Sequence, residues 1–230
     1  MARLAPEQIE KLLRTDYTGN PVNEFGVMSE ALTSLYQLAR GRGDARAARH
    51  LDFAKVFIRD WFVDPLVRGE DKLNGLHGNT HAAQAAGIAE FALVTGRDRE
   101  AAAAKQFWKF VSHDHSFANG SNSFHEKLRQ PGVEVAGSGV AALNALTSES
   151  CNTHNMLKLA RSLELISPDP EVADFHENAL FNHLVATVAP SDATDASVTW
   201  TSSNAGVATV SATGLVTAVG AGTATITATT

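Results

Sequence analysis

The residues that can do chemistry gather between Gly120 and Leu159. Glu126 ends a Gly/Ser/Asn-rich turn, and Glu149 and Cys151 are separated by one residue. A carboxylic acid on a loop, facing a Glu-x-Cys pair at a helix start, is typical of a hydrolase or a metal site. The alternative is a capped helix with a buried thiol, because a free cysteine usually packs as a small hydrophobic residue. The residue types alone favour this alternative.

Histidines lie near the same segment. His77 and His81 occur in the polar stretch NGLHGNTH, and His113 and His115 are separated by one residue. Two histidines at that spacing can bind a metal from a strand, but at a helix end they point in different directions. We therefore predict that His113 and His115 are solvated or cap a helix.

The elements that must position these residues read as a series of helical hairpins. Apolar residues recur at helical spacing, and short turns with Gly or Asp separate the runs. The predicted helices are one opened by Pro6, 27–38, one N-capped by Asp44 that continues to Trp61, 81–95, one from Asp98 through Val111, 156–166, and one opened by Asp169-Pro170. This repetition predicts a mainly α chain, an α/α solenoid or toroid whose end loops carry function.

The composition changes near Ala186. Every His, Lys and Arg precedes this residue, and only Asp192 and Asp195 are charged after it. Apolar and small polar residues then alternate in short runs separated by turns such as Thr213-Gly214. The pattern predicts a small β-sandwich that has almost nothing for catalysis and suits a spacer or a surface or carbohydrate contact.

Bulk properties exclude several classes of function. The formal charge of -6 argues against a nucleic-acid binder, which needs clustered Lys and Arg. No apolar run approaches the length that spans a bilayer, and Met1 to Glu7 lacks the apolar region of a signal peptide. A single cysteine excludes a disulfide within the chain.

Three motifs, in order, carry a resemblance to a known family. HGNTH at 77–81, GSNSFHE at 120–126 and ESCNTHNMLKL at 149–159 resemble HANTQ, GGNSxxE and ETCNTYNMLKL of the β-L-arabinofuranosidase-type glycoside hydrolases, family 127 and its relative family 146. VNEFGVMSEAL at 22–32 resembles an upstream stretch of the same family. The C-terminal segment is similar to a bacterial immunoglobulin-like domain of group 2 without its opening strand.

The resemblance implies an incomplete (α/α) barrel in residues 1–186 and a partial immunoglobulin-like domain in residues 187–230. It also implies a retaining glycosidase in which a zinc-bound cysteine attacks the sugar. By motif position, Glu126 matches the acid/base, Glu149 and Cys151 match zinc ligands, and His77 and Asn79 match sugar contacts. Zinc suits this chemistry, because it lowers the pKa of a thiol and holds it as thiolate.

The sequence departs from the family pattern at the nucleophile. The family's other zinc ligands are an adjacent cysteine pair farther along, one of which attacks, whereas Cys151 is the only cysteine here. His81 stands in place of a Gln, and His154 in place of a Tyr. His154 lies one helical turn from Cys151, so it is a candidate third zinc ligand of an ad hoc kind.

These observations leave the enzyme question open. The first hypothesis is a glycoside hydrolase-like protein that acts on plant or glycoprotein arabinofuranosides and is inactive or incomplete as this chain. The second is a non-catalytic carbohydrate-binding or cell-surface adhesion protein that keeps His77, and a third is a structural remnant. The expected partner is an arabinose-containing glycan, with polysaccharide contact through the C-terminal domain, which suggests an extracellular or cell-surface location.

Overall fold

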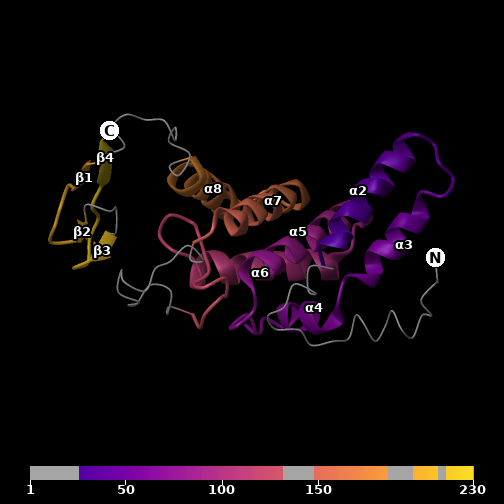
Figure 1. The fold of residues 1–230 in the computed structure, drawn as a ribbon, viewed down its shortest axis with the longest axis horizontal. Helices are drawn as coiled ribbons and strands as arrows, with labels where there is room; N and C mark the ends of the chain where they lie inside the picture. The colour runs from indigo at the N-terminus through magenta and orange to yellow at the C-terminus, as the bar shows by residue number, and fades with distance from the viewer. Residues whose placement is uncertain (1–25, 132–147, 186–198, 212–215, 230) are drawn as a thin grey trace. The chain divides into compact units, whose positions relative to one another are not determined.

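The computed structural model describes residues 26–131, 148–185, 199–211 and 216–229 (Figure 1). The helix predicted after Pro6 lies outside these residues. The chain divides into two compact units, Met1–Leu184 and Val185–Thr230. The first is helical and the second carries short antiparallel strands, which confirms the predicted mainly α chain followed by a small β region. The incomplete (α/α) barrel of residues 1–186 stays a prediction.

The helices in the described part of the first unit vary in length from 6 to 18 residues. They are α2 (Met28–Gly41), α3 (Ala48–Val56), α4 (Asp60–Val67), α5 (Gly78–Thr95), α6 (Asp98–Asp114), α7 (Ser150–Ile166), α8 (Pro170–Ala179) and the π-helical η3 (Leu180–Val185). Gly96 ends α5 in the left-handed conformation, at a φ of 66°. Asp169 begins α8, because its side chain accepts a hydrogen bond from the Glu171 amide while Pro170 takes the first helical position.

The helix predicted from Asp44 to Trp61 is wrong as a single element. The structure has α3 and α4, and between them Arg59 is extended, at φ -97° and ψ 128°. Asp44 accepts the Arg46 amide in a local turn, and the N-cap of α3 is Ala47. The break has a tertiary cause: Ala54 packs in one cluster with Leu32 and Phe91, whereas the buried residues of α4 join the main core.

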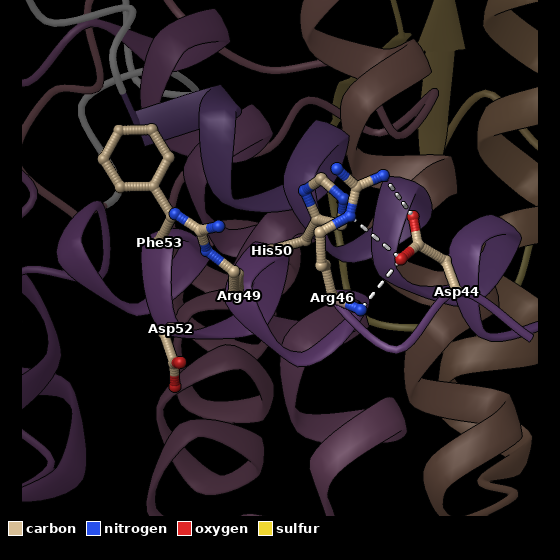
Figure 2. A pocket seen from close by; sticks show the side chains of 6 residues that line it. All are labelled: Asp44, Arg46, Arg49, His50, Asp52 and Phe53. Atoms are coloured by element: carbon tan, nitrogen blue, oxygen red, sulfur yellow. Dashed lines mark hydrogen bonds and ion pairs between the residues drawn. The ribbon is translucent and has the colours of Figure 1, made fainter.

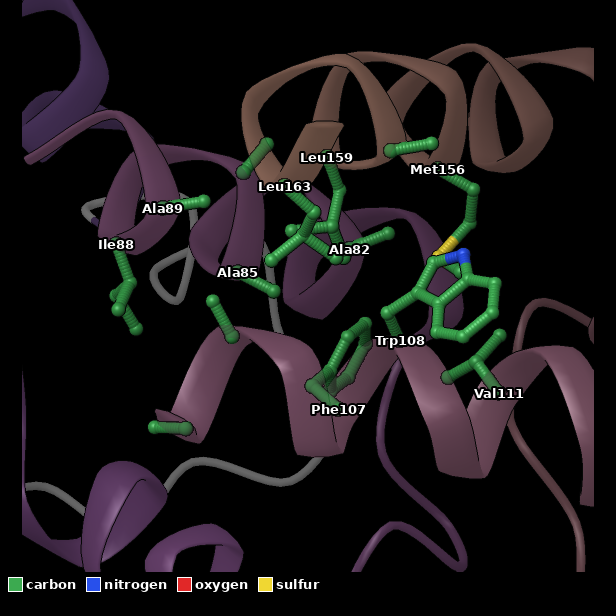
Figure 3. Packing of buried hydrophobic residues seen from close by; sticks show 14 of the residues in the cluster. Ala82, Ala85, Ile88, Ala89, Phe107, Trp108, Val111, Met156, Leu159 and Leu163 are labelled. Carbon is green, nitrogen blue, oxygen red and sulfur yellow. The ribbon is translucent and has the colours of Figure 1, made fainter. Parts of the chain in front are cut away.

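Helix α5 is the centre of the main core. It contacts α2, α6 and α7, and its small residues let these neighbours approach closely. At Gly87, a Cβ would lie 2.3 Å from Ser29 Oγ of α2. Figure 3 shows Ala82 and Ala85 of α5 among the large side chains of α6 and α7, which include Phe107, Trp108, Leu159 and Leu163. Burial of each such large side chain contributes about 1.5–3 kcal/mol, which holds α6 and α7 against α5.

In its described residues, the second unit forms two short antiparallel ladders. β1 (Thr199–Ser202) pairs with β4 (Ile226–Thr229), and β2 (Ala208–Val210) pairs with β3 (Val216–Ala218). Their registers place Thr199 opposite Thr229 and Ala208 opposite Ala218. None of the helices in the described parts of the chain is long and apolar enough to cross a membrane.

Candidate active site

Helices α5 and α7 run in the same direction, so their N-termini lie at one end of the helical unit. Near these starts, Asn155 Nδ2 of α7 donates to Asn79 Oδ1 of α5 at 2.7 Å. Farther along both helices, Ser162 Oγ of α7 donates to Glu90 Oε2 of α5 at 3.3 Å. The N-cap residues are His77 for α5 and Glu149 for α7. Two predicted site residues thus begin neighbouring helices.

The loop 120–128 forms backbone hydrogen bonds with the residues at both of these helix starts. The Gly78 amide donates to the Glu126 carbonyl at 2.8 Å, and the Ser148 amide donates to the Ser123 carbonyl at 3.1 Å. Gly78 packs closely against this loop and against α7. A Cβ at this position would lie 3.0 Å from Ser123 Cβ of the loop and 3.1 Å from Asn152 Nδ2 of α7. The three motifs therefore meet through backbone contacts as well as through side chains.

Unusual backbone conformations concentrate in the same loops. Among the described residues, the non-glycine residues with positive φ are Ser123 (72°), His125 (51°), Glu126 (64°) and Ser148 (59°). The chain reverses between Phe124 and Lys127, which exchange two backbone hydrogen bonds. His125 and Glu126 are the central residues of that turn, with the φ signs of a type I′ turn, where Asn-Gly is preferred. Such conformations persist where the surroundings enforce them, often at functional sites.

Glu126 and His77 approach each other at the surface. His77 Nε2 lies 3.9 Å from Glu126 Oε2, and the side chains are 28% and 43% exposed, so a ligand can reach both. The Thr80 amide donates to His77 Nδ1 at 3.3 Å, so Nδ1 is an acceptor and the ring proton is on Nε2. This hydrogen bond directs the N–H of His77 toward the carboxylate.

Cys151 lies in the first turn of α7, beside the same carboxylates. Although the residue is accessible to solvent, partial burial of its thiol raises the pKa of Cys151, and the charges of Glu149 and Glu126 raise it further. Backbone hydrogen bonds at the helix start oppose this rise without reversing it. The thiol is therefore protonated at neutral pH, and a protonated thiol is a weak nucleophile.

Comparison with known proteins decides the family. Residues 1–203 match the family model of the β-L-arabinofuranosidase GH127 catalytic domain. The chain belongs to this family. Residues 181–230 match the bacterial Ig-like domain (group 2), so both resemblances seen in the sequence are confirmed. A curated relative, an α-L-arabinofuranosidase of Bifidobacterium longum subsp. longum, is 64% identical over 47 residues. This match covers 20% of the chain and 4% of that relative.

The zinc predicted from the family motifs is not accommodated by the described residues alone. Catalytic zinc usually takes three protein ligands. Glu149 and Cys151 offer two donors, and the described part of the chain holds no group of three or more His, Cys, Asp or Glu that could bind a metal. His154, the candidate third ligand, is exposed on α7 and does not complete such a group.

The remaining predicted residues have mixed positions. Asn79 is half-buried, and its side-chain oxygen accepts from Asn155, so part of its amide is engaged with α7. His113 is exposed, in accord with its predicted solvation. His115 does end α6 but is fully buried, with Nε2 2.8 Å from Asp71 Oδ2. Its partner is 44 residues away in sequence, which no local pattern could indicate.

The hollow surface of Figure 2 lies elsewhere. It is lined by residues of the α2–α3 connection and of α3 itself, namely Asp44, Arg46, Arg49, His50, Asp52 and Phe53. Arg46 hydrogen-bonds the Asp44 carboxylate, which lowers the pKa of Asp44. None of the five predicted site residues belongs to this lining. Its interactions are local and exposed, so we place the candidate site at the starts of α5 and α7.

Proposed function

We propose that the surface formed by the starts of α5 and α7 binds an arabinofuranoside of a glycan, with Glu126 as the proton donor to the glycosidic oxygen. The observation that supports this proposal is the 3.9 Å approach of His77 Nε2 to Glu126 Oε2 on an accessible, conformationally enforced turn. His77 orients the sugar and holds the carboxyl group. Asn79 is the second residue of α5, directly after Gly78, and it extends this polar surface along the helix.

We infer that this chain alone does not hydrolyse a glycoside, because it lacks an effective nucleophile. A retaining glycosidase places its nucleophile about 5 Å from the acid, on the opposite side of the bond. Cys151 is near Glu126, but burial and the two carboxylates raise its thiol pKa and keep it protonated. Among the described residues the predicted zinc donors stop at Glu149 and Cys151, one short of the three that catalytic zinc usually takes. We therefore propose a glycoside hydrolase-type sugar site that binds and does not turn over by itself.

A binding and turnover assay tests this proposal. Purified chain is titrated with methyl β-L-arabinofuranoside by NMR and assayed, with added zinc, on an aryl β-L-arabinofuranoside. We expect sugar-dependent shifts of the Glu126 amide without hydrolysis. These shifts should be lost in His77→Ala but not in His113→Ala, whose histidine is exposed. Absence of binding would contradict the sugar site. Hydrolysis that disappears in Cys151→Ser would contradict the missing nucleophile.

A substitution at Glu126 separates function from stability. Glycine adopts positive φ without strain, so Glu126→Gly relieves the turn and raises the free energy of unfolding by about 1 kcal/mol, while removing the proton donor. Opposite changes in stability and sugar binding are the signature of a residue kept for chemistry. A loss of stability would show that Glu126 is needed for the fold of the turn.

The alternative function, carbohydrate binding or adhesion without a hydrolase-type site, draws on the match of residues 181–230 to a bacterial Ig-like domain. In that case glycan binding belongs to the second unit. It would then survive His77→Ala, which the same titration reveals.

A further inference from the structure

A chain of hydrogen bonds connects η3 to both site loops. His183 Nε2 donates to the Ser148 carbonyl at 3.0 Å. Ser148 Oγ donates to Ser121 Oγ, and Ser121 Oγ donates to Asn119 Oδ1 at 2.7 Å. Ser148 immediately precedes Glu149, and Ser121 lies in the loop that leads to Glu126. The His183 imidazole is therefore bonded to the residue that precedes Glu149 and, through Ser148, to the loop that carries Glu126.

His183 occupies a position of the α8–η3 segment where an apolar residue would be expected. The buried face of α8 consists of Val172, Phe175 and Ala179, and His183 continues their spacing of three or four residues. The side chain is 4% exposed, and burial lowers the pKa of His183, so it is neutral at pH 7. A polar ring at such a position costs desolvation unless its hydrogen bonds compensate, which gives the bond to Ser148 energetic weight.

The same segment supports the loop by direct packing. Asn178 Nδ2 donates to the Ala118 carbonyl at 3.1 Å. Gly120 lies so close to α8 that a Cβ would be 2.7 Å from Ala179 Cβ and 2.8 Å from its Cα. The loop that carries Glu126 is thus in contact with both α5 and α8.

We propose that His183 is a positioning residue, which joins the loop of Glu126 to the start of α7 through Ser148 and Ser121. Ser148 has a φ of 59°, a conformation that a non-glycine residue keeps only when its surroundings hold it. Without the imidazole donor, the Ser148 carbonyl loses this hydrogen bond. The backbone at Ser148 can then reorient, which changes the positions of Glu149 and Cys151 at the start of α7. The inference rests on the proposed function, because these loops form the proposed sugar site.

Amide hydrogen exchange tests the inference without any sugar. In His183→Leu, we expect about fivefold faster exchange of the Ser148 amide, the factor that corresponds to one lost neutral hydrogen bond. Hydrogen exchange of the Gly78 amide, which donates to the Glu126 carbonyl, should also become faster. Amides inside α5, such as that of Ala89, should be unchanged. His183→Gln keeps an N–H donor and should restore the slow exchange, and His113→Leu is the exposed control.

Ser121→Ala provides a second variant that leaves the α8 face intact. It breaks the link between Ser148 and Ser121 and should accelerate exchange at Ser148 as well. Equal acceleration inside α5 and in the loops would overturn the inference, because His183 would then support only global stability. Unchanged exchange at Ser148 in both variants would overturn it too. A failure of sugar binding with the expected exchange pattern would reject the proposed function and leave the positioning role standing.

Discussion

The starts of α5 and α7 and the tip of the α2–α3 hairpin are both accessible and charged, yet they are held together in different ways. At the helix starts, hydrogen bonds join residues far apart in sequence, such as Gly78 to Glu126 and Ser148 to His183. At the hairpin tip they join near neighbours: Asp44 accepts from Arg46, and the Arg42 amide donates to the Leu38 carbonyl. The hollow surface is at the tip, whereas the enforced backbone geometry is at the helix starts.

The two regions differ in what their backbone conformations require of the sequence. A hollow between local turns needs no special sequence, because each turn is satisfied by its own residues. A type I′-like turn with His125 and Glu126 in place of Asn-Gly costs stability and is kept by contacts from several elements. Perturbations should therefore have large, transmitted effects at the helix starts and small, local effects at the tip.

The largest contrast is expected between two glycines. Gly120 and Gly43 have similar φ, 82° and 73°, but a Cβ at Gly43 meets nothing within 4 Å, whereas at Gly120 it meets Ala179. Gly43→Ala should lose about 1 kcal/mol of unfolding free energy through left-handed backbone strain alone. Gly120→Ala adds overpacking and should lose about 3 kcal/mol. Urea unfolding followed by circular dichroism measures both, and equal losses would contradict the tight contact between the loop and α8.

A second effect concerns acid stability near the α5 start. Burial lowers the pKa of His81 to about 4; the hydrogen bond to the His77 carbonyl opposes this shift, and the charges of His77 and Arg59 add to it. The folded state thus holds His81 neutral, so its contribution is complete above the ordinary histidine pKa, near 6.5, and is lost as the pH falls toward 4. The loss amounts to about 3 kcal/mol at the acid end.

His81→Gln removes this titration and keeps an N–H that can donate to the His77 carbonyl, as His81 Nδ1 does at 2.8 Å. Unfolding free energies of the wild type and the variant, measured from pH 7 to pH 4, should converge or cross as the pH falls. His113→Gln, at an exposed position, should follow the wild type. Parallel curves for the wild type and His81→Gln would show that His81 is not the acid-sensitive group.

Local signals predicted the helix ends well, and tertiary contacts explain the failures. Gly96 and Asp169 each satisfy backbone groups by themselves, so the boundaries they mark were readable in sequence. Helix α7 begins at Ser150, ahead of the predicted 156, because Asn152 and Thr153 are buried against neighbours that periodicity cannot reveal. The break at Arg59 separates two clusters that form only in the folded unit.

The candidate site was predictable as a set of motifs at one end of a helical array, and its individual contacts were not. Motif resemblance selected Glu126, His77, Glu149 and Cys151, but residue spacing did not show that two parallel helices and one loop bring them together. Sequence analysis did not select His183 as a site residue. It lies between Leu180 and Leu184 in a helical pattern, where a histidine indicates an irregular surface position. Its partner, the carbonyl of Ser148, leaves no trace in sequence.

The smallest effect is expected at the hairpin tip. The Asp44 side chain is partly exposed, and the hydrogen bonds from Arg46 lower the pKa of its carboxyl group. The associated stabilisation is present at neutral pH and is lost as the pH falls through this lowered pKa, and salt and side-chain entropy keep it small. Asp44→Asn should leave unfolding by urea unchanged within error, and NMR titration should show the Asp44 pKa rising toward its ordinary value in Arg46→Met. The decisive comparison is hydrogen exchange at Ser148, which neither substitution should alter. An altered rate there would couple the tip to the site and remove the distinction between the two regions.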